Sequence, residues 1–551
     1  MGEISGAAII ARALKTQGVK SMFGVVGIPV SGIASAAQRE GIHYYGMRHE
    51  MPATYAAQAV GYLEGRPGVS LVVSGPGALN AVGAFANAWS NRWPLILLGG
   101  ASDSMRMGMG DFQESEQVAA MAPYAKWAIR VESMERLPAY IAEAFRKALA
   151  PPAGPVYLDL PGNHIMGSTD EEKVQWAPHV PNPPRLPSDP RSVEQAMEVL
   201  KSAEQPLIVV GKGIAYARAE EEMQRFVERT GIPYLAMPMA KGAIPDDHDQ
   251  SVAAARSFVL QNTDVIFLAG ARLNWQLHFG LPPRLRPDVK VIQLENNPEE
   301  IGVNVPASAA LIGDAKVSLG QLLDHLDQHP WQFPQDSEWL QSVRANAREN
   351  EELVAGMVGH DGDPIGYYTS LIEVKNAVPR DIVYVVEGEG TMAIGRTVLD
   401  SYHPRHRLDA GSFGSMGLGA GFAVGAAVHH KGKRVVCVQG DSAFGFAGME
   451  VEVAARYKLP ITWVVINNNG IGGSPVDRFK GEHLPPNALT PGIRYEKVME
   501  GMGGKGYYAT SAEEIRAAMK EALTLDGPSL IHVPIDPLSK RKPQKFGWLT
   551  R

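Results

Sequence analysis

The chain has 551 residues, of which 45% are hydrophobic and 20% charged, and its net charge at pH 7 is −7. This composition is typical of a soluble globular protein, and an acidic balance without a basic stripe argues against a nucleic-acid partner. The sequence has no apolar run of about 18 residues, so it predicts no membrane span. It opens without the segments of a signal peptide, and its single Cys437 can form no intramolecular disulfide, so we expect a cytoplasmic protein.

Short runs of β-branched residues alternate with helical stretches, which predicts parallel sheets covered by crossover helices. Six prolines between Pro178 and Pro190 predict a linker after the first block, and a polar helical stretch over 332–363 precedes the third. The clearest strands are expected at Val69–Val73, Pro94–Leu98, Val156–Leu160, Pro206–Val210, Val265–Leu268 and Val289–Leu294. We therefore expect an α/β fold with three doubly wound parallel-sheet domains and a C-terminal lid or tail, over residues 1–177, 191–330, 364–536 and 537–551.

Polar residues follow two expected strands of the third block. Gly440-Asp441-Ser442 ends the apolar run 435–439, and Asn467-Asn468-Asn469-Gly470 ends the run 461–466. Because open α/β sheets bind ligands at the carboxyl ends of their strands, these groups should lie together. Asp441, Asn468 and the carbonyl of Gly470 offer the oxygen ligands that Mg²⁺ accepts, and the small Ser442 and Ala443 would let backbone N–H groups approach an anion. The alternative is a pair of ordinary strand ends with turn residues.

This pair of motifs, in which Asn468 follows Asp441 by 27 residues, resembles the Mg²⁺–diphosphate signature of thiamin diphosphate (ThDP) enzymes. The resemblance implies pyrimidine-binding, central and diphosphate-binding domains. The segment 44–50 resembles the Arg-His-Glu region of that family's first domain, and the match implies that Glu50 hydrogen-bonds N1′ of the aminopyrimidine. Taken alone, a glutamate after a histidine would more often be a solvated residue at the start of a helix.

Two further segments, 74–80 and 411–417, extend the resemblance over most of the chain. They imply that Met416 is the apolar fulcrum that bends ThDP and that the carbonyl of Gly414 faces the pyrimidine amino group. The same match implies further contacts with the cofactor from Gly75, Asn80 and Ile471. Active sites of this family lie between subunits, so Glu50 of one subunit would serve Asp441 of another, in a dimer and more specifically in a dimer of dimers.

The segments 440–450 and 254–257 resemble the acyl-CoA branch of the family, which contains oxalyl-CoA decarboxylase and 2-hydroxyacyl-CoA lyase. The match implies an acyl-CoA substrate in contact with Ile28, Phe112, Gln113, Arg256, Ser257, Arg396, Ser539 and Arg541. Arginines supply the charge-assisted donors that phosphates need, although each one taken alone would more often be a surface residue. The match also implies a regulatory ADP at Lys212, Arg272 and Asp314, with Glu295 at the position where an Asp would hold the ribose. Ser539 and Arg541 match a lid that closes on substrate, and the alternative is a disordered basic tail.

Phe112-Gln113-Glu114 resembles the lyases rather than the decarboxylase and favours cleavage of a 2-hydroxyacyl-CoA to formyl-CoA and an aldehyde or ketone, with 2-hydroxyisobutyryl-CoA as one candidate substrate. Glu50, Gln113 and Glu114 are the candidate catalytic residues, and Gln113 would hold the 2-hydroxyl unless it is only a helix-cap amide. Three alternatives remain: an oxalyl-CoA decarboxylase, an acetolactate synthase-like enzyme with FAD, and an inactive subunit of the same fold. An intact set of Glu50, Asp441 and Asn468 argues against the last.

Overall fold

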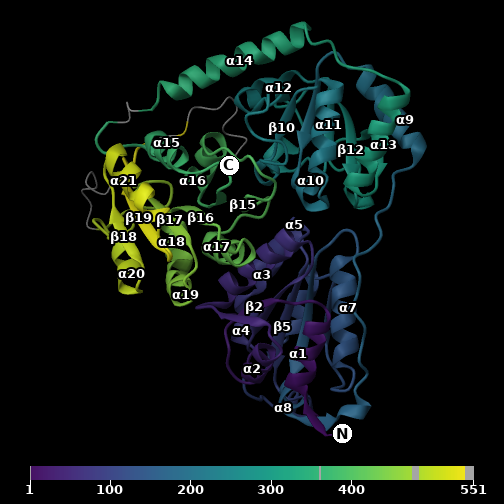
Figure 1. Ribbon diagram of the computed structural model, residues 1–551, viewed down its shortest axis with the longest axis vertical. Coiled ribbons are helices and arrows are strands. Elements are labelled where there is room, and N and C mark those ends of the chain that lie inside the picture. The colour runs from purple at the N-terminus through teal and green to yellow at the C-terminus, as the bar shows by residue number, and fades with distance from the viewer. Residues whose placement is uncertain (1, 359–361, 475–482, 540, 542–551) are drawn as a thin grey trace.

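The computed structural model describes residues 2–358, 362–474, 483–539 and 541. In this part of the chain, three parallel sheets of six, five and six strands form, together with a short antiparallel pair of β1 (Glu3–Ser5) and β8 (Ser168–Asp170). Figure 1 shows the N-terminal unit in purple and blue below the C-terminal unit in green and yellow, with the central unit beside the latter. The predicted α/β class with three parallel sheets is confirmed.

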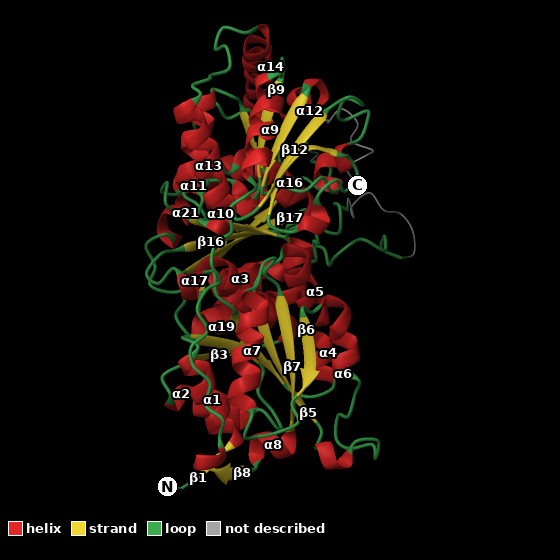
Figure 2. Cartoon of the chain, turned by 90° about the vertical axis from the view of Figure 1, so that its right-hand side faces the viewer, coloured by secondary structure: helices red, strands yellow, loops and turns green. Residues whose placement is uncertain are grey.

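The N-terminal sheet has the strand order β3 (His43–Gly46), β2 (Ser21–Gly24), β4 (Gly68–Val72), β5 (Leu95–Ala101), β7 (Pro155–Pro161) and β6 (Trp127–Arg130). Its helices lie on both faces of the sheet (Figure 2) and are α1 (Gly6–Thr16), α2 (Ser31–Arg39), α3 (Glu50–Glu64), α4 (Pro76–Asn80), α5 (Val82–Asn91), α6 (Gln117–Met121), α7 (Leu137–Leu149) and α8 (Gly162–Met166).

The central sheet has the order β10 (Tyr234–Ala236), β9 (Pro206–Val210), β11 (Val265–Ala269), β12 (Lys290–Glu295) and β13 (Ala307–Ile312). Its helices are α9 (Pro190–Lys201), α10 (Lys212–Ala217), α11 (Glu220–Thr230), α12 (Arg256–Asn262) and α13 (Ala315–Gln328). The predicted polar helical stretch contains α14 (Glu338–Ala355), which leads into the C-terminal unit.

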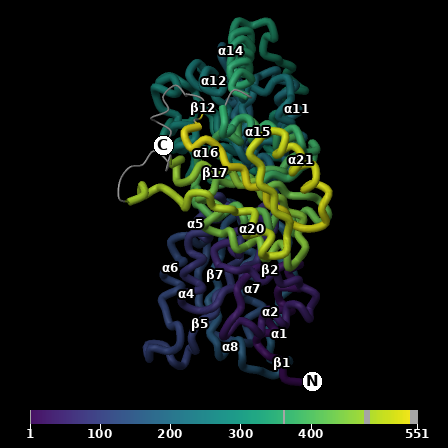
Figure 3. The backbone as a smooth tube through the Cα atoms, turned by 90° about the vertical axis from the view of Figure 1, so that its left-hand side faces the viewer, coloured from purple at the N-terminus to yellow at the C-terminus, as the bar shows by residue number. Residues whose placement is uncertain are grey.

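The C-terminal sheet has the order β15 (Arg407–Asp409), β14 (Val383–Val386), β16 (Val435–Gly440), β17 (Ile461–Asn467), β19 (Ser529–Pro534) and β18 (Lys505–Tyr508). Its helices are α15 (Tyr367–Ala377), α16 (Glu389–Val398), α17 (Leu418–His429), α18 (Asp441–Ala447), α19 (Val451–Arg456), α20 (Tyr495–Gly501) and α21 (Ala512–Ala522), with a single 3₁₀ turn η8 (Gly448–Glu450) before α19. In the view of Figure 3 this unit faces the viewer, above the N-terminal unit and below the central unit.

Each sheet reverses its order of strands near one side: between β2 and β4, between β9 and β11, and between β14 and β16. The connections that follow the two neighbouring strands at this place turn to opposite faces of the sheet, which opens a crevice outside the carboxyl ends of the strands. The metal motif begins at Asp441, directly after β16, so it lies at one of these three places.

Close packing of α3 against α17 joins the N-terminal and C-terminal units within one chain. A Cβ atom at Gly421 would lie 2.5 Å from the carbonyl oxygen of Pro52, and one at Gly425 would lie 2.4 Å from that of Ala56. The two glycines, one helical turn apart, therefore let the backbones approach. The two units share one hydrophobic core, to which Trp93 belongs.

The predicted strands are confirmed, with ends displaced by three residues at most. Cys437 is fully buried in β16, and burial raises the pKa of its thiol well above the ordinary value. Among the helices of the described residues, none has both the length and the apolar character that crossing a membrane requires.

Candidate functional site

The metal motif forms a compact turn at the end of the C-terminal sheet. Asp441 is the first residue of α18 and is 2% exposed. Its carboxylate accepts hydrogen bonds from the backbone N–H of Ser442 at 2.7 Å and from that of Gly470 at 2.9 Å. Burial raises the pKa of Asp441 to about 6, and these N–H groups act in the opposite direction. The bonds fix the carboxylate beside the loop that follows β17.

Three oxygens converge in this turn. The side-chain oxygen of Asn468 lies 2.8 Å from the carbonyl oxygen of Gly470 and 3.3 Å from Oδ1 of Asp441, while its Nδ2 donates to the Tyr367 hydroxyl at 2.8 Å. Oxygens without a proton between them repel one another, and a hard cation removes that repulsion. With the amide turned over, Nδ2 would donate to the Gly470 carbonyl and to Oδ1 of Asp441, and the side-chain oxygen would accept from the Tyr367 hydroxyl and the Gly473 N–H, so four hydrogen bonds favour that orientation unless a cation is bound.

A single carboxylate would make this a weak metal site without further oxygen ligands. Among the described residues, no three His, Cys, Asp or Glu side chains gather as metal ligands. Mg²⁺ in proteins commonly binds through one or two carboxylates together with phosphate oxygens. The donor set of Asp441, Asn468 and Gly470 therefore fits an ion that is shared with a diphosphate.

The segment 411–417 passes close to this turn and is held by Glu387, which follows β14. The Glu387 carboxylate accepts the backbone N–H groups of Gly417, Leu418 and Gly419, the last two at 3.0 and 2.9 Å, and the amide of Gln439. Glu387 is 2% exposed, and burial raises its pKa to about 7. Because Gln439 lies in β16 two residues before Asp441, one carboxylate connects the segment of Met416 to the metal turn.

Glu50 is the first residue of α3, and its carboxylate is buried in the N-terminal unit. Its Oε2 accepts a hydrogen bond from Nδ2 of Asn80 at 3.1 Å. The two residues come from the segments that were predicted to form the pyrimidine half of the site, so the fold brings that half together. Among the described residues, no hydrogen bond or ion pair joins Glu50 to Asp441 or Asn468 within the chain.

The loop between β5 and α6 carries Phe112, Gln113 and Glu114. Gln113 has a φ of 55° and its Oε1 accepts from Oγ of Ser74 at 3.0 Å, beside the turn of Gly75. The Glu114 carboxylate accepts three backbone N–H groups of its own loop, from Gly108, Gly110 and Asp111. These bonds lower the pKa of Glu114. Glu114 thus fixes the loop, and its catalytic role stays a prediction.

Three apolar residues near these segments are exposed to solvent: Ile28 is 69% exposed, Phe112 63% and Ile471 52%. Their segments follow β2, β5 and β17, so each lies at the carboxyl edge of a sheet. Large apolar side chains exposed at a functional edge indicate contact with a ligand or another chain.

The predicted phosphate contacts lie in a group of arginines between the central and C-terminal units. The charges of Arg284, Arg396 and Arg541 act on Arg256 and, together with burial as the larger cause, lower its pKa to about 10. Arg284, which sequence reasoning missed, is 2% exposed and donates to Oγ of Ser257 at 3.2 Å.

Not all of these groups face an open site. Arg396 makes two bonds to the buried Asp409, at 2.9 and 2.7 Å. The hydroxyl of Ser539 accepts the backbone N–H of Tyr367 at 3.2 Å, which places the start of the tail beside the metal turn. Residues 540 and 542–551 of the predicted lid lie outside the described residues.

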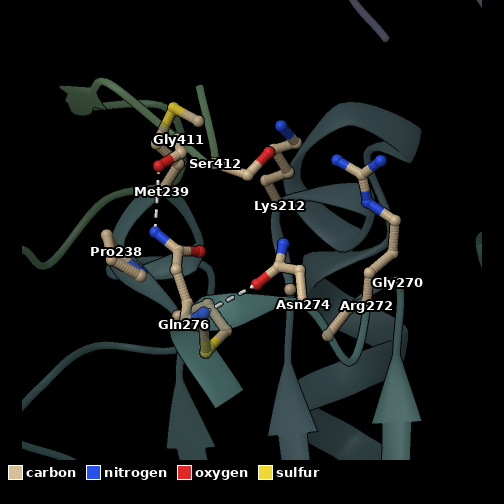
Figure 4. Close-up of a pocket in the computed structure, with 12 residues that line it drawn as sticks. Lys212, Pro238, Met239, Gly270, Arg272, Asn274, Gln276, Gly411 and Ser412 are labelled. Atoms are coloured by element: carbon tan, nitrogen blue, oxygen red, sulfur yellow. Dashed lines mark hydrogen bonds between the residues drawn. The ribbon is translucent and has the colours of Figure 1, made fainter. Parts of the chain in front are cut away.

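A pocket at the carboxyl edge of the central sheet contains Lys212, Gly270 and Arg272 (Figure 4), and we call it the central pocket. It lies at the place where the order of strands reverses, because Lys212 follows β9 and Gly270 follows β11. Burial lowers the pKa of Lys212 well below its ordinary value, and a bound anion would favour its charged form.

The two acidic residues predicted for this pocket are already engaged. The Glu295 carboxylate accepts the backbone N–H groups of Asn296 and Asn297. Asp314 caps α13 and binds Arg185 at 2.8 Å. On the opposite wall, Nε2 of Gln276 donates to the carbonyl of Gly411 at 3.0 Å, which joins the pocket to the segment 411–417 (Figure 4).

Family models match the chain in three places. The thiamine pyrophosphate enzyme N-terminal TPP binding domain matches residues 4–120, the central domain 193–322 and the C-terminal TPP binding domain 387–533. Human 2-hydroxyacyl-CoA lyase 1 is 46% identical over 100% of this chain and 97% of its own length. Oxalyl-CoA decarboxylase of Escherichia coli (strain K12) is 41% identical over 97% and 95%, and 2-hydroxyacyl-CoA lyase of Arabidopsis thaliana 38% over 97% and 96%. With all three models matched in order, the chain belongs to the thiamine pyrophosphate enzyme family.

Proposed function

We propose that this protein is a ThDP- and Mg²⁺-dependent lyase that cleaves a 2-hydroxyacyl-CoA to formyl-CoA and an aldehyde or ketone, and that it catalyses the reverse condensation. The observation that carries the proposal is the 46% identity to human 2-hydroxyacyl-CoA lyase 1 along the whole chain. The metal turn, which brings Asp441, Asn468 and Gly470 together, supports the cofactor. When bound, ThDP supplies the electron sink that carbon–carbon cleavage needs.

The roles of the residues follow from their positions. Asp441, Asn468 and the carbonyl of Gly470 would bind Mg²⁺ and, through it, the diphosphate. Met416 would support the bent cofactor, because the bonds to Glu387 fix the segment that carries it. Glu50 would bind N1′ of the pyrimidine ring, where a carboxyl group in a dry pocket can hold a proton at that nitrogen.

The complete site would lie between two subunits, in a dimer or a dimer of dimers. Glu50 is not bonded to the metal turn of its own chain, and both halves of the site end at edges with exposed apolar residues. A second copy would cover Ile28, Phe112 and Ile471 and bring its own Asp441 towards Glu50. The boundaries 1–177, 191–330 and 364–536 are the domains that we propose for this assembly, and the cytoplasm is the proposed compartment.

The CoA end of the substrate would bind at the group of arginines. The charges of Arg396 and Arg541 act on Arg256, and a polyanion would reduce this repulsion. Gln113 would face the acyl end, from a loop that Glu114 fixes. Ser539 and Arg541 would contact the thioester side when the tail closes.

Substrate assays separate the proposal from its alternatives. Purified protein with ThDP and Mg²⁺ is incubated with 2-hydroxyacyl-CoAs, including 2-hydroxyisobutyryl-CoA, and separately with oxalyl-CoA. Formyl-CoA and a carbonyl product from the former support the lyase; carbon dioxide from oxalyl-CoA without carbonyl product would identify the decarboxylase. Bound FAD in the purified protein would favour an acetolactate synthase-like enzyme. Glu50→Gln should abolish turnover without unfolding the protein.

A second function is favoured by the cations of the central pocket, which we propose as a site for a nucleotide such as ADP. Differential scanning fluorimetry with ADP tests it, with Lys212→Ala and Arg272→Ala as disabling variants and Lys290→Ala, on the same sheet, as the control. A rise in the unfolding temperature that both disabling variants remove supports the site. No rise with ADP, or a rise that survives both variants, contradicts it.

A further inference from the structure

The backbone that leads into Glu50 is held by three side chains of the C-terminal unit. Oε1 of Glu450 accepts the backbone N–H of Arg48 at 3.2 Å and that of His49 at 3.1 Å. The Tyr457 hydroxyl accepts the N–H of Gly46 at 2.9 Å, and Nη2 of Arg456 donates to the Gly46 carbonyl at 2.7 Å. Glu450 is the last residue of η8, Arg456 is the last residue of α19, and Tyr457 follows it directly.

The position of β3 explains why these groups are available. It is the edge strand of the N-terminal sheet and pairs only with β2 in the described residues. One row of its backbone N–H and C=O groups therefore has no neighbouring strand. Arg456 and Tyr457 take the place of that strand at Gly46, and Tyr457 also donates to the carbonyl of Tyr44 at 3.4 Å.

Glu450 is placed for this contact at a considerable energetic cost. It is 1% exposed, and burial raises its pKa to about 7, while the bonds from Arg48 and His49 act in the opposite direction. A buried carboxyl group is stable only when donors surround it. Its two donors here are main-chain groups of the residues that directly precede Glu50, which is the start of α3.

We propose that Glu450, Arg456 and Tyr457, which we call the clamp, are positioning residues that orient Glu50 by fixing the backbone of residues 44–49. The inference rests on the proposed role of Glu50. Glu50 directly follows Arg48 and His49, so a shift of their backbone would move its carboxylate, and a displacement of about 1 Å can cost about 100-fold in rate. The clamp and the metal turn belong to the same C-terminal unit. In the proposed dimer, this unit would hold the metal of one active site and would orient the Glu50 that serves the second active site.

Hydrogen exchange and kinetics together test the clamp. The variants are Glu450→Gln and the milder Tyr457→Phe, which removes only the hydroxyl. Glu373→Gln is the matched control: Glu373 is a buried carboxylate of the same unit, and it binds Arg516 through both oxygens at 2.9 Å, on α15. Exchange of the backbone amides in a peptide covering 44–51 is followed in the protein without ThDP, and kcat and KM are measured with ThDP and Mg²⁺.

We expect faster exchange at residues 46–49 in both clamp variants and a fall in kcat of about 10- to 100-fold, with KM for the acyl-CoA within about twofold. The control should leave both readouts unchanged. The inference would be overturned if Tyr457→Phe and Glu450→Gln kept the amide exchange and the kcat of the wild type. It would also be overturned if the control variant Glu373→Gln lost as much kcat as the clamp variants. Glu50→Gln separates the two claims: if it stays active, the role of Glu50 fails, whereas an inactive Glu50→Gln beside fully active clamp variants refutes the clamp alone.

Discussion

Replacing Glu387 by alanine should both destabilise the protein and weaken ThDP binding. The change removes the acceptor of four donors, which are the N–H groups of Gly417, Leu418 and Gly419 and the amide of Gln439. Leaving one buried donor without an acceptor costs about 1–3 kcal/mol. These donors lie at the start of α17, beside the segment that carries Met416.

The net loss should be smaller than the sum of four such costs. Burial has already raised the pKa of Glu387 to about 7, so part of the hydrogen-bond energy offsets the desolvation of the carboxylate. We therefore expect Glu387→Ala to lower the free energy of unfolding by about 3 kcal/mol, the upper end of the cost of one buried donor left without an acceptor.

The assay is urea unfolding of the protein without cofactor, followed by titration of ThDP with Mg²⁺ and detection of tryptophan fluorescence. Glu389→Ala, two residues away on the exposed start of α16, serves as the control and should change stability by at most about 0.5 kcal/mol. A Glu387→Ala variant within about 1 kcal/mol of the wild type, with unchanged affinity for ThDP, would refute this account of the segment 411–417.

Two further predictions concern stability. Gly425→Val should lower the unfolding temperature strongly, because its Cβ would lie 2.4 Å from the carbonyl oxygen of Ala56. Gly320 lies in α13, and a Cβ added there would have no atom within 4 Å, so Gly320→Ala should stabilise the protein by about 0.5–1 kcal/mol in the same thermal scan. The pKa of His406 is lowered to about 4 and that of His430 to about 3, in both cases mainly by burial. As the pH falls below about 6.5, these histidines are therefore protonated in the unfolded chain before they are protonated in the folded protein. Their contribution to stability is present above that pH and is lost towards pH 4. We expect a loss of about 1 kcal/mol per histidine, because both side chains are partly exposed to solvent. The free energy of unfolding, measured with urea at several pH values between 7 and 4.5, should fall less steeply with pH in His430→Asn than in the wild type. An unchanged dependence on pH would contradict the proposed contribution of His430.

The fold could be predicted well because its determinants are local. Apolar runs such as 435–439 and 461–466 carry the strand signal in their own residues, and both became neighbouring strands of one sheet. Asp441 and Asn468 could be placed together for the same reason, since residues after parallel strands meet at one edge. The hydrogen bonds that the N–H groups of Ser442 and Gly470 donate to Asp441 add the detail that a sequence does not contain.

The supporting residues could not be predicted, because they act on the backbone of distant segments. Glu387 precedes Gly417 by 30 residues, and Glu450 follows Arg48 by 402. No spacing rule connects such pairs, and buried glutamates read as ordinary charged residues in the sequence. Arg284 was missed for a similar reason, since only the fold brings it to Ser257. Glu114 shows the opposite case, where a motif residue binds its own loop.

The most direct test of the central claim is the identity of the products. Protein supplied with ThDP and Mg²⁺ is mixed with a panel of 2-hydroxyacyl-CoAs, and formyl-CoA and the carbonyl product are separated by chromatography, with Glu50→Gln as the inactive control. The account predicts both products in equal amounts from at least one substrate and none from the control. Carbon dioxide from oxalyl-CoA, with no formyl-CoA from any 2-hydroxyacyl-CoA, would contradict it.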